Sequence, residues 1–371
     1  MSEKEVVVEA INLFKWFPVR SGIVRSVSGK TSMIPLAQPV EKFKFYDSET
    51  NKFFTMKTVE TMKFKGGFVH AVDGVSLKIY KGETFGLVGE SGCGKSTTGL
   101  LLLQLLDRTS GSIFFKGIET QKYTRDRHFR KNIQIIFQNP YESLSPRFNV
   151  LDTVAEPLRL MNLVEDELEI EEMVIKELEE VGLVPGTEFL DRYPHELSGG
   201  QRQRVGVARA FILDPEFVVA DEPVSMLDVS IRVGVLKIMR ELTRSRGTGF
   251  LFITHDLALA RHMCDRIAVM YLGRIVEQGP TEELVHQPLH PYTKALIKAV
   301  PKADPDARRT EELPIRGEVP SGINIPSGCR FHPRCPYTTE ECKQIDPALM
   351  ETANKDHLVA CIRYKKINDL K

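Results

Sequence analysis

The fold class is indicated most clearly by one stretch of sequence, Thr84-Phe-Gly-Leu-Val-Gly89-Glu-Ser-Gly-Cys-Gly94-Lys95-Ser96. Its first five residues form a short apolar run that predicts a buried strand, and the apolar run from Thr97 to Leu106 predicts a helix. The glycine-rich loop between them has the pattern G-x-x-x-x-G-K-[ST]. A strand, such a loop and a helix in this order predict an α/β fold that binds a nucleoside phosphate.

The residue types of this loop explain its chemistry. Glycines let backbone N–H groups converge on phosphate oxygens without interference from a Cβ atom, and the following helix adds the positive end of its dipole. We expect Lys95 to reach the β- and γ-phosphates of ATP and the Ser96 hydroxyl to ligate Mg²⁺. The predicted binding residues of the loop are Gly89, Ser91, Gly92, Cys93, Gly94, Lys95, Ser96 and Thr97, with Cys93 as a small spacer.

Two further apolar runs end in polar side chains. Phe217-Val-Val-Ala-Asp221-Glu222 predicts a strand followed by two carboxylates, of which Asp221 is expected to hold Mg²⁺ and Glu222 to act as general base on water. His255 follows the apolar run from Phe250 to Ile253. Ligands bind at the carboxyl ends of strands in open α/β sheets, which favours a functional role. A solvated acidic turn and a structural histidine are the alternatives.

Length and charge bound the class of protein. The 371 residues exceed what one domain usually holds, and prolines multiply after about residue 280, where we expect a domain boundary. Lys+Arg and Asp+Glu are both 50, so no strong basic field is expected to attract nucleic acid. No apolar run reaches the roughly 18 residues of a membrane span, and the N-terminus lacks a secretory signal. We therefore expect an intracellular chain that can dock on a membrane component.

Four of the six cysteines lie close together near the end of the sequence, spaced as Cys329-x₅-Cys335-x₆-Cys342-x₁₈-Cys361. In a reducing compartment such a cluster favours metal ligation over disulfides. Four thiolates suit an iron–sulfur cluster or a tetrahedral zinc ion. His332 is an alternative ligand, and reduced structural cysteines without a metal are the remaining alternative. A metal would staple an appendage that has few apolar runs.

Leu197-Ser198-Gly199-Gly200-Gln201 resembles the signature sequence of ABC-type ATPases. It leads into a predicted helix, whose N-terminal N–H groups suit an anion. In that family the signature faces the γ-phosphate held by a second subunit, so each ATP is sandwiched between two chains. The resemblance therefore implies that Ser198, Gly200 and Gln201 contact ATP, and that Asp228 corresponds to the D-loop aspartate of the dimer interface.

Other sequence motifs of the ABC family occur in this chain, in the order in which the family has them. Gln138 resembles the glutamine that senses Mg²⁺ and the transport partner, so the resemblance implies that it joins Ser96 and Asp221 at the metal ion. His255 resembles the switch histidine at the γ-phosphate. The implied catalytic groups are thus Glu222, His255 and Gln138.

Two aromatic residues that precede an expected insertion at about residues 19–66 are candidates for stacking on adenine. Phe17 is the expected residue, and its neighbour Trp16 is the alternative. Val224 and Met226 depart from the threonine and alanine common in the family. Neither departure removes a phosphate or metal ligand, so it concerns the packing of the D-loop.

Four segments carry a narrower resemblance, to the ATPase subunits of dipeptide and oligopeptide importers. They are the residues from Ala71 to Ser76, those from Asn139 to Arg147, those from His290 to Leu296, and the cysteine segment that starts at Gly328. The resemblance implies an ABC ATPase domain over residues 1–280, with a RecA-like mixed sheet, an insertion at about 19–66 and a helical subdomain at about 140–200. It also implies a loop-rich domain over 281–371 with a [4Fe–4S] cluster, zinc being the alternative.

The same resemblance implies the partners and the activity. They are a second, different ATPase chain, two transmembrane permease subunits and, indirectly, an extracellular solute-binding protein, with this chain on the cytoplasmic face of the membrane. The expected function is import of di- or oligopeptides, driven by ATP-dependent pairing of the nucleotide-binding domains. Sugar oligomers or nickel are alternative cargoes, and a soluble non-transport ABC ATPase is a further alternative. The signature argues against a phosphate-loop kinase or GTPase.

Overall fold

The computed structural model describes residues 5–19, 42–47, 52–57, 68–120, 126–139, 143–300, 315 and 317–368. The chain divides into two units, one of Met1–Trp16 with His70–Lys371 and one of Phe17–Val69. The second unit contains an antiparallel hairpin of β2 (Lys42–Asp47) and β3 (Lys52–Lys57). The rest of the insertion expected at 19–66 lies largely outside the described residues, and its purpose stays open.

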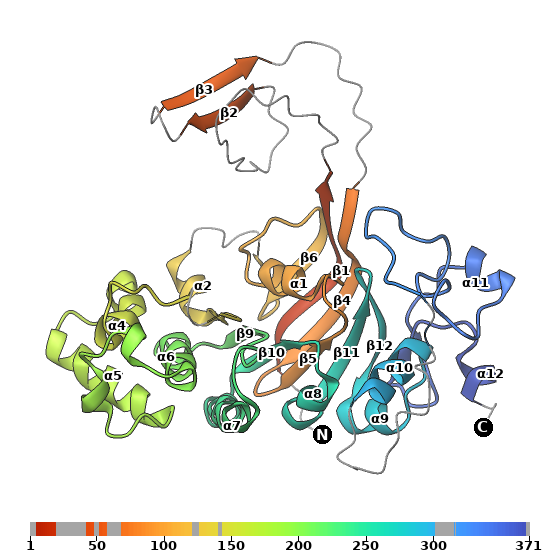
Figure 1. Ribbon diagram of the computed structural model, residues 1–371. Coiled ribbons are helices and arrows are strands. Elements are labelled where there is room, and N and C mark those ends of the chain that lie inside the picture. The colour runs from red at the N-terminus through yellow and green to blue at the C-terminus, as the bar shows by residue number, and fades with distance from the viewer. Residues whose placement is uncertain are drawn as a thin grey trace. The chain divides into compact units, whose positions relative to one another are not determined.

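A mixed sheet crosses the first unit in the order β13-β14-β12-β11-β5-β10-β9-β8 (Figure 1). Neighbouring strands from β11 to β8 are parallel. Strands β5 and β10 are buried along their whole length, as expected for apolar strands that are covered on both faces. The parallel strands are β11 (Arg266–Tyr271), β5 (Thr84–Val88), β10 (Gly249–Thr254), β9 (Phe217–Asp221) and β8 (Ile133–Ile136).

The other edge of this sheet is antiparallel and includes residues from the end of the chain. Strand β12 (Arg274–Pro280) pairs with β14 (Leu358–Val359), which pairs with β13 (Met350–Glu351). Next to β14, the buried His357 ring lies 2.8 Å from Glu277 Oε1 and 3.1 Å from Glu283 Oε1. Burial opposes protonation of His357, but these carboxylates outweigh it and raise its pKa.

A second sheet has the order β4-β1-β6-β7. Its strands are β4 (Phe68–Tyr80), β1 (Val6–Pro18), β6 (Ser110–Phe115) and β7 (Ile118–Glu119). An apolar core joins this sheet to the main sheet and to helix α1 (Lys95–Leu102), with Leu13, Ile79 and Leu101 fully buried. Helix α1 begins two residues before the predicted span from Thr97 to Leu106. It ends before Leu106 because the backbone turns left-handed at Gln104 (φ 54°).

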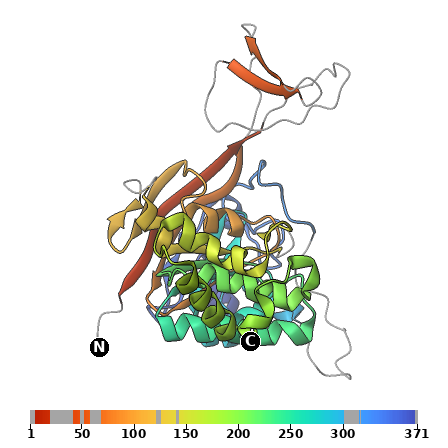
Figure 2. The same ribbon diagram turned by 90° about the vertical axis from the view of Figure 1, so that its left-hand side faces the viewer.

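Helices α4 (Val150–Met161), α5 (Glu167–Glu180) and α6 (Gly199–Phe211) pack together at one side of the first unit, where Figure 2 looks onto them. Each begins at a side chain that accepts a backbone N–H, namely Asn149, Asp166 and Ser198. A second core runs from these helices to the main sheet and includes Val154, Val174 and Phe211, which are completely buried. The fold therefore brings the signature segment to the start of α6.

The remaining helices complete the first unit. Helix α2 (Arg127–Asn132) precedes β8, and α7 (Val229–Arg246) and α8 (Leu257–Met263) flank β10 in the sequence. The last part of the chain forms α9 (Thr281–His286), α10 (Pro291–Ala299), α11 (Glu340–Gln344) and α12 (Tyr364–Asn368). Among the described residues, every helix is too short or too polar to cross a membrane. A domain boundary near residue 280 stays a prediction.

Candidate nucleotide site

The phosphate loop connects β5 to α1, as the sequence predicts. The Lys95 ammonium is buried and donates to the carbonyl oxygens of Gly89 at 2.8 Å and Glu90 at 3.0 Å. These bonds keep the lysine over its own loop. The N-terminus of α1 follows directly, so the loop combines a fixed cation with the free N–H groups of a helix start.

Two glycines of the loop have no room for a side chain. A Cβ atom on Gly94 would lie 1.9 Å from the carbonyl oxygen of Ala71, and the φ of Gly94 is 108°. A Cβ atom on Gly89 would lie 2.2 Å from the carbonyl oxygen of Met270. The close approach of β4 and β11 therefore requires glycine at both ends of the loop.

Two of the three residues expected at Mg²⁺, Ser96 and Asp221, lie together. The Ser96 hydroxyl donates to Asp221 Oδ1 at 3.0 Å, across the gap between α1 and the end of β9. Burial raises the pKa of Asp221, and the bond from Ser96 opposes that rise. One hydroxyl and one carboxylate oxygen at this spacing are the ligand types that Mg²⁺ takes beside a phosphate loop.

Two residues that follow other strands contact the side chain of Glu222. Gln138, after β8, donates through Nε2 to Glu222 Oε2 at 3.2 Å, and His255 Nδ1, after β10, lies 3.2 Å from Glu222 Oε1. Glu222 has a left-handed backbone (φ 47°), fixed by an N–H bond to the Ile253 carbonyl at 2.9 Å. The carboxyl ends of three parallel strands thus bring the expected general base, glutamine and histidine to one point.

The signature residues form the start of α6. Ser198 Oγ accepts the N–H of Gln201 at 3.3 Å, and Gln201 Oε1 accepts the N–H of Ser198 at 2.9 Å. This reciprocal capping box fixes both side chains. A Cβ atom on Gly200 would lie 2.5 Å from Ile231 Cγ2, so this glycine allows α6 to approach α7.

The D-loop leads into α7. Asp228 occupies the N-cap position of this helix without a capping bond from its side chain. Large apolar residues nearby are exposed, with Val229 at 74% and Val233 at 66%. Apolar side chains exposed beside a catalytic centre are typical of a surface that another protein covers.

The adenine-stacking residue stays a prediction. Phe17 belongs to the second unit, so its position relative to the phosphate loop is not described. The alternative, Trp16, has a fixed ring: its Nε1 donates to Asp73 Oδ1 at 2.7 Å, and its ring centroid lies 4.5 Å from that of His70.

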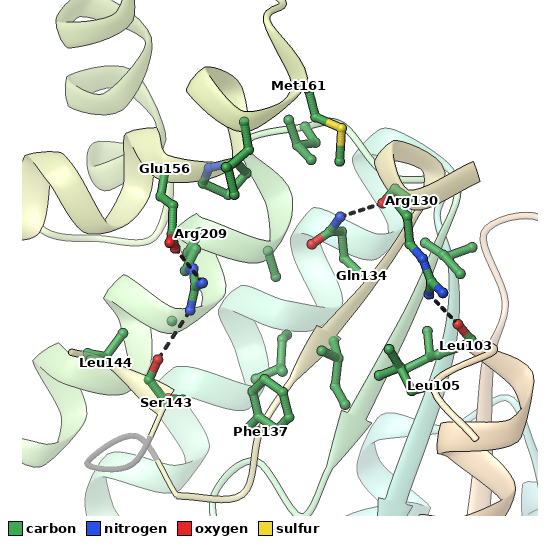
Figure 3. Close-up of a pocket in the computed structure, with 18 of the residues that line it drawn as sticks. Leu103, Leu105, Arg130, Gln134, Phe137, Ser143, Leu144, Glu156, Met161 and Arg209 are labelled. Carbon is green, nitrogen blue, oxygen red and sulfur yellow. Dashed lines mark hydrogen bonds and ion pairs between the residues drawn. The ribbon is translucent and has the colours of Figure 1, made fainter. Parts of the chain in front are cut away.

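A cavity of about 250 Å³ lies between β8, α4 and α6. Arg209 lines this cavity, where its guanidinium pairs with Glu156 at 2.6 Å and donates to the Ser143 carbonyl at 3.1 Å (Figure 3). Phe137, which precedes Gln138, also lines the cavity and is 45% exposed. The residue that contacts Glu222, Gln138, is therefore next in sequence to a residue of the cavity wall.

The four clustered cysteines line one small cavity of about 20 Å³, together with His332. All four are free thiols, and burial raises the pKa of Cys329 to about 12 and of Cys335 to about 11. Across the described residues, however, no three His, Cys, Asp or Glu side chains are grouped tightly enough to hold one metal ion. The predicted metal site is therefore not supported by this geometry, although the four thiols share a cavity.

One set of contacts has no signal in the sequence. Arg334, in the cysteine segment, binds Glu90 of the phosphate loop, and Arg330 binds Asp73 beside Trp16. A sequence pattern does not indicate which charged residues far apart in the chain will pair, so these contacts emerge only from the fold.

The strand, loop, helix and carboxylate geometry defines a phosphate-loop ATPase. A family model described as "ABC transporter" matches residues 72–225, and one described as "Oligopeptide/dipeptide transporter, C-terminal region" matches residues 276–342. Both matches fall within the described unit that contains the main sheet.

Curated relatives match over most of their length. The dipeptide transport ATP-binding protein DppF of Haemophilus influenzae is 48% identical over 79% of this chain and 89% of its own. The oligopeptide transport ATP-binding protein OppF of Salmonella typhimurium is 46% identical over 79% of this chain and 87% of its own. AppF of Bacillus subtilis, an oligopeptide transport ATP-binding protein, is 45% identical over 85% of this chain and 96% of its own.

Solved structures agree with the fold. The structure of cbiO1 from Clostridium perfringens, part of the ABC transporter complex cbiONQ, has a TM-score of 0.56 at 24% identity and covers 77% of this chain and 92% of its own. The dimeric ATP-binding cassette MJ0796 bound to ADP and Pi has a TM-score of 0.55 at 24% identity, over 74% of this chain and 98% of its own. The chain belongs to the family of ABC transporter ATP-binding subunits, in the oligopeptide and dipeptide group.

Proposed function

We propose that this chain binds and hydrolyses ATP to power the import of dipeptides or oligopeptides through a membrane permease. The meeting of Gln138, Glu222 and His255 beside the phosphate loop carries the ATPase part of the proposal. The relatives, whose names specify dipeptide or oligopeptide transport, support the cargo. The proposed ATPase domain spans 1–280, with a helical subdomain at about 140–200, and a second domain spans 281–371.

ATP binding is assigned to the phosphate loop and its neighbours. Backbone N–H groups from Gly89 to Thr97 surround the phosphates, and Lys95 turns from its loop carbonyls toward the β- and γ-phosphates. Mg²⁺, held by Ser96, Asp221 and Gln138, would neutralise charge on the phosphates. Phe17 stacks on adenine in this proposal.

Hydrolysis is assigned to Glu222. Its carboxylate takes a proton from the attacking water, while Gln138 and His255 hold the two carboxylate oxygens and so fix its direction. His255 is half exposed, with 58% of its side chain accessible, so its ring has space to turn toward a γ-phosphate. The strained backbone of Glu222 keeps the base at this one position.

A second ATPase subunit completes the site in this proposal. Ser198, Gly200 and Gln201 would bind the γ-phosphate of ATP held by that subunit, and Asp228 would lie at the interface. The exposed apolar residues around α7 support such a surface. We propose that the partner is a different chain of the same family, and that closing and opening of the pair moves the permease.

Two permease subunits are the proposed membrane partners, fed by an extracellular solute-binding protein, with this chain on the cytoplasmic face. The cavity lined by Phe137 (Figure 3) supports a docking site for a short permease segment. It offers apolar walls around Phe137 and one ion pair, Arg209–Glu156. A segment in this cavity would touch the residue next to Gln138, which links permease movement to the hydrolysis site.

We also propose that Cys329, Cys335, Cys342 and Cys361 hold a [4Fe–4S] cluster. The four thiols line one cavity, although the described residues contain no group tight enough to hold a single metal ion. Such a cluster binds one thiolate at each of four irons, so it does not need the tight three-ligand group of a single zinc ion. Its proposed task is to staple the loop-rich segment, with no redox role.

Glu222→Gln tests the assignment of the general base. The amide keeps the shape of the side chain but cannot take a proton, so ATP should still bind while turnover falls by at least about 100-fold. ATP affinity is measured by calorimetry and turnover by phosphate release from the full chain assembled with its partners.

Glu216→Gln is the matched control, because Glu216 precedes the same strand, β9, and pairs with Lys116 at 2.7 Å. It should keep parental turnover. Near-parental phosphate release by a homogeneous Glu222→Gln sample would remove Glu222 from the catalytic role.

A further inference from the structure

The cysteine segment contacts the phosphate loop through a bidentate ion pair. Arg334 Nη1 lies 2.7 Å from Glu90 Oε2, and Arg334 Nη2 lies 3.1 Å from Glu90 Oε1. The Arg334 side chain is only 8% exposed, so water screens the pair weakly. Glu90 directly follows Gly89, the first glycine of the loop. A charged fork thus joins the segment between Cys329 and Cys335 to the start of the phosphate loop.

The backbone of the same loop residue is fixed by another residue from the end of the chain. Tyr292, in α10, accepts the N–H of Glu90 through its hydroxyl at 3.0 Å. The Tyr292 ring is completely buried and packs against Tyr271 and Phe331, at centroid distances of 4.8 and 5.4 Å. Since Phe331 belongs to the cysteine segment, one aromatic cluster supports both contacts to Glu90.

These contacts fix Glu90, which also binds Lys95, the lysine that is proposed to contact the phosphates. The Glu90 carbonyl accepts a bond from Lys95 at 3.0 Å, while its N–H goes to Tyr292 and its carboxylate to Arg334. Each polar group of Glu90 is therefore fixed. A loop held this way loses little conformational freedom when phosphates bind, which favours affinity.

We propose that Arg334, together with Tyr292, is a positioning residue for ATP binding, through which the segment between Cys329 and Cys335 holds the phosphate loop in its binding form. The inference rests on the proposed ATP site and adds a regulating contact to it. Arg334 touches no reacting atom in this arrangement, and acts through Glu90. Neighbouring Arg330 fixes the segment separately, through Asp73 and the Leu272 carbonyl.

Arg334→Gln tests the inference in the full chain assembled with its partner subunits. Replacing a two-bond charged contact by one neutral amide should weaken ATP binding about tenfold. The KM for ATP should rise by a similar factor while kcat stays parental, because the hydrolysis residues are untouched. Arg334→Lys, which restores one charged bond, should recover part of the affinity. Lys343→Gln, which removes an exposed ion pair with Glu340 in the nearby helix α11, is the matched control and should change neither value.

Glu90→Gln separates positioning from simple charge neutralisation. Positioning predicts that Glu90→Gln also weakens ATP binding, and that the Arg334→Gln/Glu90→Gln double variant binds no more weakly than the weaker single variant. If Arg334 only neutralised a carboxylate near the phosphates, Glu90→Gln would bind ATP at least as tightly as the parent. That result would overturn the inference, and so would parental affinity in Arg334→Gln.

Lys95→Ala distinguishes failure of the inference from failure of the proposed site. Loss of ATP binding in Lys95→Ala, with parental binding in Arg334→Gln, would overturn only the positioning role. Parental binding in Lys95→Ala would overturn the proposed phosphate site itself. Thermal unfolding of each variant without nucleotide shows whether the loop change occurs in a folded chain, and Glu90→Gln, at a partly exposed side chain, supplies the second folded test.

Discussion

Glu222 shows at the residue scale how the fold places chemistry. Its left-handed backbone costs on the order of 1–3 kcal/mol for a residue with a side chain. The bond from its N–H to Ile253 and the contacts to Gln138 and His255 hold it there. Sequence order predicted that these residues share a function, but only the parallel strands explain why their side chains meet.

The glycines of the phosphate loop give a prediction at the same scale. Gly94→Ala would place a methyl group 1.9 Å from the Ala71 carbonyl oxygen at a φ of 108°. The loop must then move away from β4, so we expect a loss of about 3 kcal/mol or more in the free energy of unfolding. ATP binding should also be lost. Denaturant unfolding and nucleotide titration of the same sample measure both effects.

Gly92→Ala is the matched control. Gly92 also has a positive φ, of 77°, but a Cβ atom there meets no other atom within 4 Å. Only the backbone strain of about 1–2 kcal/mol should remain. Equal destabilisation by the two substitutions would contradict the close contact between Gly94 and Ala71.

At the scale of elements, the sequence predicted those strands whose formation depends on their own run of residues. The expected strand over Thr84–Val88 has the bounds of β5, and the strand expected to end at Asp221 is β9. Both are short apolar runs bounded by polar or turn residues. The pairing of β14 with β12 was not predictable, because two residues of a proline-rich segment carry too little pattern. The contacts of Arg330 and Arg334 likewise join segments far apart in the chain.

The start of α6 provides a prediction for an element. Ser198→Ala removes the bond to the Gln201 N–H, and should lower the free energy of unfolding by about 1 kcal/mol. ATP affinity of the single chain should stay parental, since Ser198 is proposed to bind the ATP of the partner subunit. ATP-dependent pairing with that subunit, measured by sedimentation, should weaken.

Asp166→Ala controls for the loss of a cap. Asp166 accepts the N–H of Leu168 at 3.0 Å at the start of α5. Losing this bond should lower the free energy of unfolding by an amount similar to that for Ser198→Ala. Pairing should remain parental in this variant. If both substitutions weakened pairing equally, helix destabilisation would explain the result and the proposed role of Ser198 would fail.

At the scale of the whole molecule, the first unit presents three regions with proposed functions around one sheet. The proposed hydrolysis residues lie at the carboxyl ends of the parallel strands, the cavity of Figure 3 opens between β8 and the helices α4 and α6, and the cysteine segment contacts the phosphate loop. The motifs predicted the first region by residue number. The other two depend on packing between distant segments, which motif order does not contain.

Peptide import driven by ATP hydrolysis in this chain is tested most directly by the uptake of labelled short peptides. The measurement uses liposomes that contain the assembled transporter, with its solute-binding protein outside and ATP inside. We expect ATP-dependent peptide uptake that stops when this chain carries Glu222→Gln. Absence of peptide uptake under conditions where nickel or a sugar oligomer is imported, or peptide uptake that continues unchanged with Glu222→Gln, would contradict it.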